Sequence, residues 1–217
     1  MISAQLKEAS RILCLGAHSD DIEIGCGGTV LSLIEHSKSL EFYWVVLSGA
    51  GERASEAERS ARCFLRGAGS ETIVVKTFRD GFLPHLGSEV KEYFEELKRA
   101  FSPDLIFTHF RHDLHQDHRF VSELTWNTFR NHLILEYEIP KYDGDLGSPN
   151  CFVPLSKSLC QKKIRALMDH FGSQRNRQWF SEDLFHGLMR LRGAESASPS
   201  SFAEGFYCRK MLLDASV

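Results

Sequence analysis

The chain has 217 residues, of which 42% are hydrophobic and 25% charged, and a formal net charge of −3 at pH 7. This composition is typical of a soluble globular protein, and the lack of a broad basic surface argues against nucleic acid as a partner. No apolar run approaches the roughly 20 residues of a membrane-spanning helix, and residues 1–11 lack the apolar centre of a secretory signal. We therefore expect a single domain over residues 1–217 that lies in the cytoplasm without membrane insertion.

Six cysteines are scattered along the chain without a Cys-x-x-Cys pair. This spacing indicates neither a zinc ribbon nor a compact disulfide framework. Most of them are expected to be small core residues, with Cys26 the one closest to the polar segments described below.

The first half of the chain alternates predicted strands with predicted helices. In chain order these are a strand over 11–17, a helix over 26–38 after a polar loop, a strand over 41–48, a helix over 53–69, a strand over 71–76, a helix over 87–101 beginning with a Ser cap, and a strand over 104–110. Such alternation implies right-handed crossovers and a mainly parallel sheet. We therefore predict a Rossmann-like α/β fold with helices on both faces of the sheet.

The second half is less regular. Residues 136–155 are rich in Pro, Gly, Asp and Tyr and are expected to form a long functional loop or rim. Helices are predicted over 156–173 and 181–193, followed by a final strand over 205–213.

Two segments rich in His and Asp follow strands of the predicted sheet. "AHSDD" (17–21) leaves the first strand, and "HFRHDLHQDH" (109–118) leaves the fourth, about ninety residues later. Because function gathers at the carboxyl ends of parallel strands, the two segments are expected to converge at one edge. Imidazole and carboxylate suit a divalent ion such as Zn²⁺, which in an open catalytic site has three protein ligands and a water.

The residues alone leave the ligand set open. His112, His115 and His118 recur at every third position, which a helix or a tight turn would bring to one side. A histidine standing alone in such a loop would be an ordinary surface residue, and Asp20 or Asp21 could cap a helix. Only one of two adjacent Asp residues can easily cap a helix, so the other needs a different role. Together with the histidines of the second segment, this pattern predicts a metal-assisted hydrolase.

"AHSDD" paired with "HQDH" (115–118) resembles the PIG-L/LmbE family of zinc-dependent N-deacetylases. "GERASEAERSARCFLRGAG" (51–69) is similar to the family's second helix, and "FRDGFL" (78–83) to its Asp-Gly substrate loop. The resemblance implies an enzyme that removes the N-acetyl group from a small N-acetylglucosamine-type sugar or sugar conjugate.

The resemblance also implies roles for the residues of the two polar segments. His18, Asp21 and His118 would bind the metal, Zn²⁺ or another divalent ion. Asp20 would be the general base for metal-activated water, and also the simplest proton donor to the leaving amine. His115 would stabilise the tetrahedral oxyanion.

Further roles are implied outside this set. Asp117 would orient His115 or a ligand, and Arg53 and Asp80 would hold sugar hydroxyls, although a surface charge and a turn former are ordinary alternatives for those two. Ser19 stands where the family usually has Pro, which loosens the backbone between ligand and base without removing either. Other candidates for the rim are His109, His112, Tyr142, Trp179, Arg190, Arg192 and Glu204.

Two alternatives to this function remain at the level of sequence. One is a metal-dependent amidase or esterase that acts on another acylated metabolite. The other is a non-catalytic nucleotide-binding α/β module, which the combination of base, ligands and oxyanion partner disfavours. The "GCGG" stretch (25–28) matches no phosphate-binding loop and is expected to let the backbone pass beneath the site and start the helix.

Overall fold

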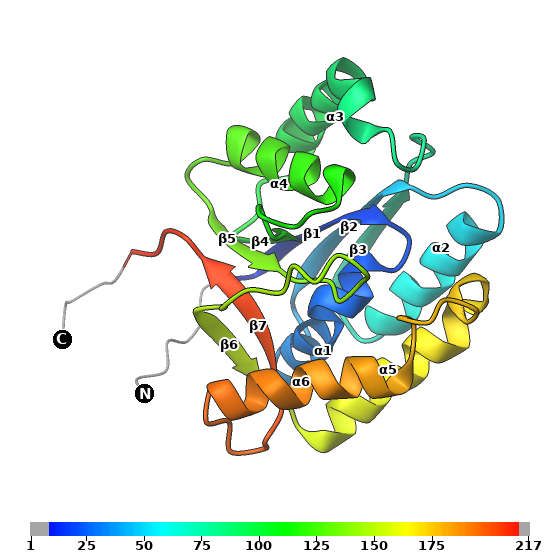
Figure 1. Ribbon diagram of the computed structural model, residues 1–217. Helices are drawn as coiled ribbons and strands as arrows, with labels where there is room; N and C mark the ends of the chain where they lie inside the picture. Colours follow the sequence, from blue (N-terminus) through cyan, green and yellow to red (C-terminus); the bar gives the residue numbers. More distant parts are fainter. Residues whose placement is uncertain (1–8, 213–217) are drawn as a thin grey trace.

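The computed structural model describes residues 9–212 and contains one seven-stranded sheet (Figure 1). In spatial order its strands are β3 (Ser70–Val75), β2 (Glu41–Ser48), β1 (Arg11–His18), β4 (Leu105–His109), β5 (Leu133–Tyr137), β7 (Ala203–Cys208) and β6 (Cys151–Pro154). Strands β1 to β5 run parallel, whereas β7 pairs antiparallel with both β5 and β6. The predicted mainly parallel α/β sheet is confirmed, with an antiparallel edge in addition.

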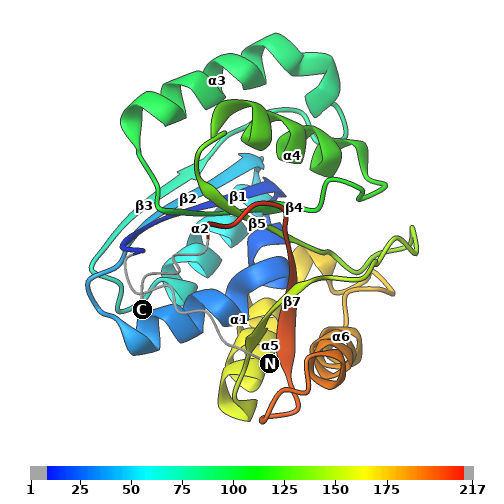
Figure 2. The ribbon, with the colours of Figure 1, turned by 90° about the vertical axis from the view of Figure 1, so that its left-hand side faces the viewer.

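Helices cover both faces of the sheet (Figure 2). One face carries α1 (Asp21–His36), α2 (Glu52–Phe64), α5 (Lys157–His170) and α6 (Glu182–Glu195), and the other carries α3 (Gly87–Ala100) and α4 (Gln116–Thr128). Short 3₁₀ turns, η1 (Leu83–Leu86) and η2 (Gly172–Gln174), precede α3 and follow α5. The buried apolar residues of β1 alternate accordingly: Ile12 and Cys14 join the core beneath α1, and Leu13 and Leu15 join the core beneath α4.

α1 begins earlier than expected. It starts at Asp21, after a turn of only two residues that follows β1, so the polar loop is much shorter than predicted and the "GCGG" glycines lie inside the helix. A Cβ atom on Gly25 would come within 2.1 Å of the Tyr137 ring. These glycines therefore allow α1 to pack closely on its neighbours, rather than starting the helix.

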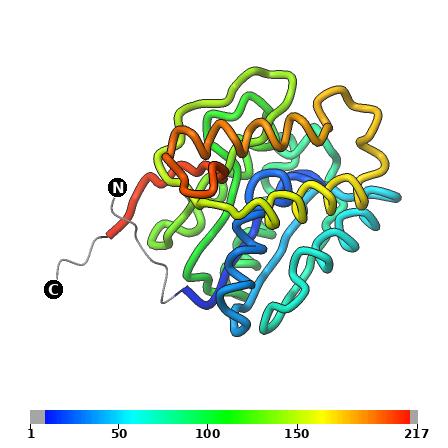
Figure 3. The backbone as a smooth tube through the Cα atoms, turned by 90° about the horizontal axis from the view of Figure 1, so that it is seen from below, coloured from blue at the N-terminus to red at the C-terminus, as the bar shows by residue number. Residues whose placement is uncertain are grey.

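An ion pair between Lys163 and Glu204 contacts the backbone in the middle of α1. The Glu204 carboxylate on β7 accepts the backbone N–H groups of Gly28 and Thr29 at 2.8 and 2.7 Å. Lys163 on α5 donates to Glu204 and to the Ile24 carbonyl, both at 2.6 Å. Since α5 lies against α1, as Figure 3 shows from below, the pair ties the helix that begins at the site to two distant segments.

Other predictions for single elements were wrong in detail. No element was predicted for residues 119–135, which supply most of α4 and the start of β5, and the expected loop over 136–155 contains β6. α3 continues directly from η1 and has no side-chain cap, so Ser88 does not cap it. The last strand ends at Cys208; position 213 of the predicted strand and most of segment 1–11 lie outside the described residues.

None of the helices within residues 9–212 has the length and apolar character needed to cross a membrane.

Candidate metal centre and active site

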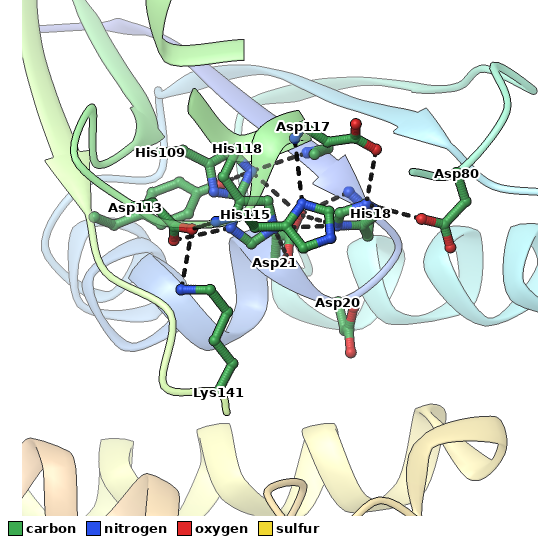
Figure 4. A network of polar contacts seen from close by, with 12 residues as sticks. His18, Asp20, Asp21, Asp80, His109, Asp113, His115, Asp117, His118 and Lys141 are labelled. Carbon is green, nitrogen blue, oxygen red and sulfur yellow. Dashed lines mark hydrogen bonds and ion pairs between the residues drawn. The ribbon is translucent and has the colours of Figure 1, made fainter. Parts of the chain in front are cut away.

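The candidate site lies at the topological switch point of the sheet, on either side of which the strands were added in opposite directions. From β1 the chain continues to β2 on one side, whereas β4 lies on the other side of β1. Ligands of open α/β sheets bind at the carboxyl ends of the strands that flank such a switch. β1 ends at His18 and the segment after β4 leads into α4, so the two polar segments meet at this point, as Figure 4 shows.

The three residues that the resemblance implies as ligands form a close triangle. His18 Nδ1 lies 3.1 Å from His118 Nε2 and 3.3 Å from one oxygen of Asp21. The other oxygen of Asp21 lies 3.4 Å from His118 Nε2. Donor atoms bound tetrahedrally to zinc at about 2.0–2.1 Å are about 3.3–3.4 Å apart, so the spacing of these donors fits a zinc ion.

In His18 and His118, the ring nitrogen that points away from the donor triangle contacts a carboxylate. His118 Nδ1 lies 2.9 Å from Asp113, and His18 Nε2 lies 3.1 Å from Asp80 and 3.3 Å from Asp117. These contacts leave His118 Nε2 and His18 Nδ1 facing each other as ligand atoms. Besides the triangle, three overlapping groups of side chains could hold a metal: His18 with His115 and His118, Asp21 with His109 and His118, and His18 with Asp80 and Asp117.

Asp113 and Lys141 form a support that the sequence did not reveal. Lys141 Nζ lies 3.0 Å from the Asp113 oxygen that does not meet His118, and it also pairs with Asp145. Asp113 stood out only as a polar residue between histidines, and Lys141 belonged to the expected loop. The pair fixes Asp113 behind a candidate ligand and neutralises its buried charge.

Asp117 and His115 occupy the start of α4. The Asp117 carboxylate accepts the N–H groups of Gly81 at 2.8 Å and Leu83 at 3.1 Å, which holds the loop after β3 beside the site. Its backbone N–H donates to His115 Nδ1 at 3.2 Å, so His115 caps the helix. The carboxylate of Asp117 thus meets His18, whereas its backbone orients His115.

Charge in the cluster is unevenly distributed. Burial would raise the pKa of Asp21, but the imidazoles of His118, His109 and His18 hold that pKa well below its usual value. His109 is fully buried, and burial together with the neighbouring His118 lowers its pKa to about 4. Asp21 is therefore an anion among imidazoles, which suits a metal ligand.

Asp20 is adjacent to Asp21 and has different surroundings. It occupies the N-cap position of α1, yet its side chain makes no capping hydrogen bond. One of its oxygens lies 3.2 Å from Arg53, and the other is buried without a hydrogen-bond partner. Burial and the charge of Asp21 raise the pKa of Asp20, although Arg53 opposes this shift.

The predicted site residues line one cleft of about 230 Å³. Those in its lining are His18, Asp20, Asp21, Arg53, Asp80, His115 and His118. Arg53 bridges Asp20 and Asp80, the latter at 3.3 Å. Asp117 lies outside the lining but contacts His18, so the structure brings all the predicted site residues together.

The further rim candidates divide into two groups. Tyr142 and Trp179 line the cleft, together with Ile139, Lys141, Asp143, Gln174 and Arg177, which the sequence did not single out. His109, Arg192 and Glu204 are buried, the last two in ion pairs with Glu138 and Lys163. His112 and Arg190 are exposed and outside the lining, so the expected three-histidine face reduces to His115 and His118.

Ser19 is buried, and its hydroxyl has no hydrogen-bond partner. The departure from proline therefore leaves an unsatisfied polar atom between a candidate ligand and the candidate base.

Similar folds occur among solved structures. The N,N'-diacetylchitobiose deacetylase of Pyrococcus horikoshii is 21% identical over 92% of this chain and 84% of that one, with a TM-score of 0.69. A deacetylase of the teicoplanin biosynthesis pathway is 15% identical over 91% and 96%, with a TM-score of 0.72. GalB, the 4-carboxy-2-hydroxymuconate hydratase of Pseudomonas putida, is 15% identical over 96% and 99%, with a TM-score of 0.76.

At these identities the likeness concerns the fold, which deacetylases and a hydratase share. The sequence itself gives the closer assignment, because the family model described as "PIG-L: GlcNAc-PI de-N-acetylase" matches residues 13–129, more than half of the chain. That span contains most of β1, both polar segments and all the residues to which the resemblance gave a catalytic, metal-binding or substrate-binding role. The chain belongs to the PIG-L family of de-N-acetylases.

Proposed function

We propose that this protein is a zinc-dependent N-deacetylase that hydrolyses the N-acetyl group of an N-acetylglucosamine-type sugar or sugar conjugate. The main support for this function is that two features lie together in one cleft. These are a triangle of donors at zinc spacing and, next to it in sequence, an aspartate with a buried, unpartnered oxygen.

The ion would be held by His18 Nδ1, His118 Nε2 and the Asp21 carboxylate. When bound there, zinc supplies Lewis acidity, which lowers the pKa of water and polarises the acetamide carbonyl. Two imidazoles and a carboxylate also accept other divalent ions, so the site is proposed for zinc by donor type and spacing.

Asp20 moves the protons. Its unpartnered oxygen accepts a proton from the water that attacks the acetamide carbon, and the resulting acid donates a proton to the departing amine. Arg53 fixes the other oxygen at 3.2 Å, so the carboxylate cannot turn away. The raised pKa that burial gives Asp20 makes proton acceptance more favourable than for an exposed aspartate.

His115 and the outer residues position and stabilise the substrate. His115 Nδ1 accepts the Asp117 N–H, so its Nε2 carries the proton and donates to the oxygen of the tetrahedral intermediate. Arg53 and Asp80, which form an ion pair in the lining of the cleft, would hold sugar hydroxyls.

Two other functions compete with this one. A metal-dependent amidase or esterase would use the same centre on another acylated metabolite, and the likeness to GalB indicates that the fold also hosts a hydratase. A nucleotide-binding module is disfavoured because the glycines that would form a phosphate loop lie packed inside α1.

Acetate release from a panel of substrates separates these possibilities. Zinc-loaded protein is incubated with N-acetylated sugars, sugar phosphates and glycosides, and with non-sugar acetamides and acetate esters. The proposal expects release from N-acetylglucosamine compounds, loss after chelation and recovery with zinc. Acetate release only from the non-sugar amides or esters would instead indicate a metal-dependent amidase or esterase.

A further inference from the structure

One wall of the cleft comes from a different part of the chain than the candidate metal centre. The centre lies within residues 13–129, which the family model matches. Gln174, Arg177 and Trp179 line the cleft from the connection between α5 and α6, which lies outside the matched span. Contacts between this wall and a substrate therefore depend on residues that the motifs of the two polar segments do not include.

Gln174 is the most buried side chain that this connection contributes to the cleft, with 7% of its surface exposed. Its Nε2 donates to the Ser173 hydroxyl oxygen at 3.1 Å. Its Oε1 accepts no hydrogen bond from residues 9–212, and it is not fully buried, so it is open to the cleft. The amide is thus held at its nitrogen and has a free acceptor at its oxygen.

A second hydrogen bond fixes which end of the Gln174 amide is free. The Ser173 hydroxyl donates to the Glu56 carboxylate at 2.5 Å, so the hydroxyl oxygen is left to accept from Gln174. Turning the amide over would place Oε1 against an oxygen whose proton is already used. The hydrogen-bond network therefore assigns Nε2 to Ser173 and Oε1 to the cleft.

The same network places Gln174 near the candidate base. Glu56 also accepts the Ser173 N–H at 2.9 Å, and it lies three residues after Arg53, on the next turn of α2. Arg53 in turn contacts Asp20 at 3.2 Å. The connection that carries Gln174 is thus anchored one helical turn from the residue that holds Asp20, beside the space where the sugar that bears the reacting acetamide would lie.

We propose that Gln174 is a specificity-determining residue whose Oε1 accepts a hydrogen bond from one hydroxyl group of the N-acetylated sugar ring. The inference rests on the proposed function and deepens it by naming a residue that recognises the sugar. A hydroxyl group can donate to a carbonyl oxygen, whereas the hydrogen that replaces it in a deoxy sugar cannot. A bound sugar without this hydroxyl would leave the largely buried Oε1 unpaired, which weakens binding.

Four sugars test the proposal on the zinc-loaded protein: the methyl glycoside of N-acetylglucosamine and its 3-deoxy, 4-deoxy and 6-deoxy analogues. Acetate release gives kcat and KM, and calorimetry in the Asp20→Asn background gives the affinity for each sugar without turnover. Gln174→Met removes the amide and keeps the length of the side chain. Gln178→Met is the matched control, because Gln178 is an exposed glutamine of the same connection that lies outside the cleft lining.

We expect Gln174→Met to raise KM for the parent glycoside about tenfold while kcat changes by less than about twofold. At least one deoxy analogue should bind the wild-type protein about tenfold more weakly than the parent does. Gln174→Met should cause no further loss with that analogue, because one hydrogen bond has lost both its partners. Gln178→Met should match the wild-type protein with all four sugars.

Two results would overturn the inference: an unchanged KM for the parent glycoside in Gln174→Met, or an equal loss with all four sugars, which would indicate a structural role only. In both cases, acetate release by the wild-type protein leaves the proposed function in place. Conversely, if no sugar releases acetate but calorimetry shows the expected pattern, recognition of the sugar by Gln174 is supported and the proposed deacetylation is wrong. Failure of all four sugars to bind would remove both proposals.

Discussion

Asp20 and Asp21 are neighbours in sequence and both are buried, yet their surroundings give them different chemistry. Three imidazoles surround Asp21 and hold its pKa low, whereas burial and the adjacent anion raise the pKa of Asp20. One carboxylate is thereby suited to bind a cation and the other to accept a proton. The pattern "SDD" predicts two carboxylates at one place, but the division between them depends on His109 and Arg53, which lie far away in sequence.

Replacing Asp113 tests the support of a candidate ligand. Asp113→Asn keeps the shape but removes the anion that holds His118 Nδ1 at 2.9 Å, so zinc affinity should fall about 10- to 100-fold. Competition with a chromophoric chelator measures the affinity. Asp145→Asn is the matched control, because Asp145 pairs with Lys141 but not with a histidine. Equal affinities in the two variants would show that Asp113 does not support the ion.

Ser19→Pro should stabilise the protein by about 0.4–1 kcal/mol, because it restricts the unfolded chain and removes a buried hydroxyl without a partner. The free energy of unfolding in urea measures the change. Zinc content should stay unchanged. A destabilised variant would mean that the backbone at this position does not accept proline.

At the scale of elements, the sequence predicts the strands and helices whose apolar residues follow a regular pattern. The strands at 11–17 and 41–48 are found because burial on both faces requires continuous apolar runs. The edge strand at 71–76 is only partly buried, and its run of β-branched residues indicates it instead. α4 is missed because its first turn carries the polar site residues "HQDH", which hide the helical pattern. α1 is misplaced because glycines usually end or precede helices, whereas here close packing against Tyr137 requires them inside one.

The Lys163–Glu204 ion pair, which joins α5 to β7 beside α1, should contribute to stability. Lys163→Met leaves the Glu204 carboxylate buried without its cation and should cost about 3–5 kcal/mol of unfolding free energy. Lys162→Met, which alters an exposed neighbour on the same helix, should cost little. The double variant Lys163→Met/Glu204→Gln should cost less than Lys163→Met alone. A double-variant loss equal to or above that of Lys163→Met would contradict the ion-pair account.

At the scale of the whole molecule, the topology brings distant residues together. His18 and His118 are separated by 100 positions, yet their ring nitrogens lie 3.1 Å apart because β1 and β4 are parallel neighbours at the switch point. That convergence followed from the alternation of strands and helices alone. The cleft wall with Gln174 and Arg177 could not be predicted, since it depends on how an irregular connection folds back over the site.

Metal binding should be visible in global stability. If zinc binds only the folded protein, a concentration near 100 times its Kd adds about 2.7 kcal/mol, or about 5–10 °C in Tm for a chain of this size. Thermal unfolding of chelated and zinc-loaded protein measures the shift. His18→Ala should abolish it, because that substitution removes one corner of the donor triangle. An equal shift in wild type and His18→Ala would place the metal elsewhere.

In the proposed mechanism, Asp21 binds the ion and the adjacent Asp20 transfers the protons. The most direct measurement is zinc content and acetate release determined on the same sample of Asp20→Asn, with Asp169→Asn, an exposed position on α5, as the control. We expect one zinc per chain in both variants and a loss of acetate release by about 10²- to 10⁴-fold in Asp20→Asn only. Normal acetate release by zinc-loaded Asp20→Asn, or loss of its zinc, would contradict that division.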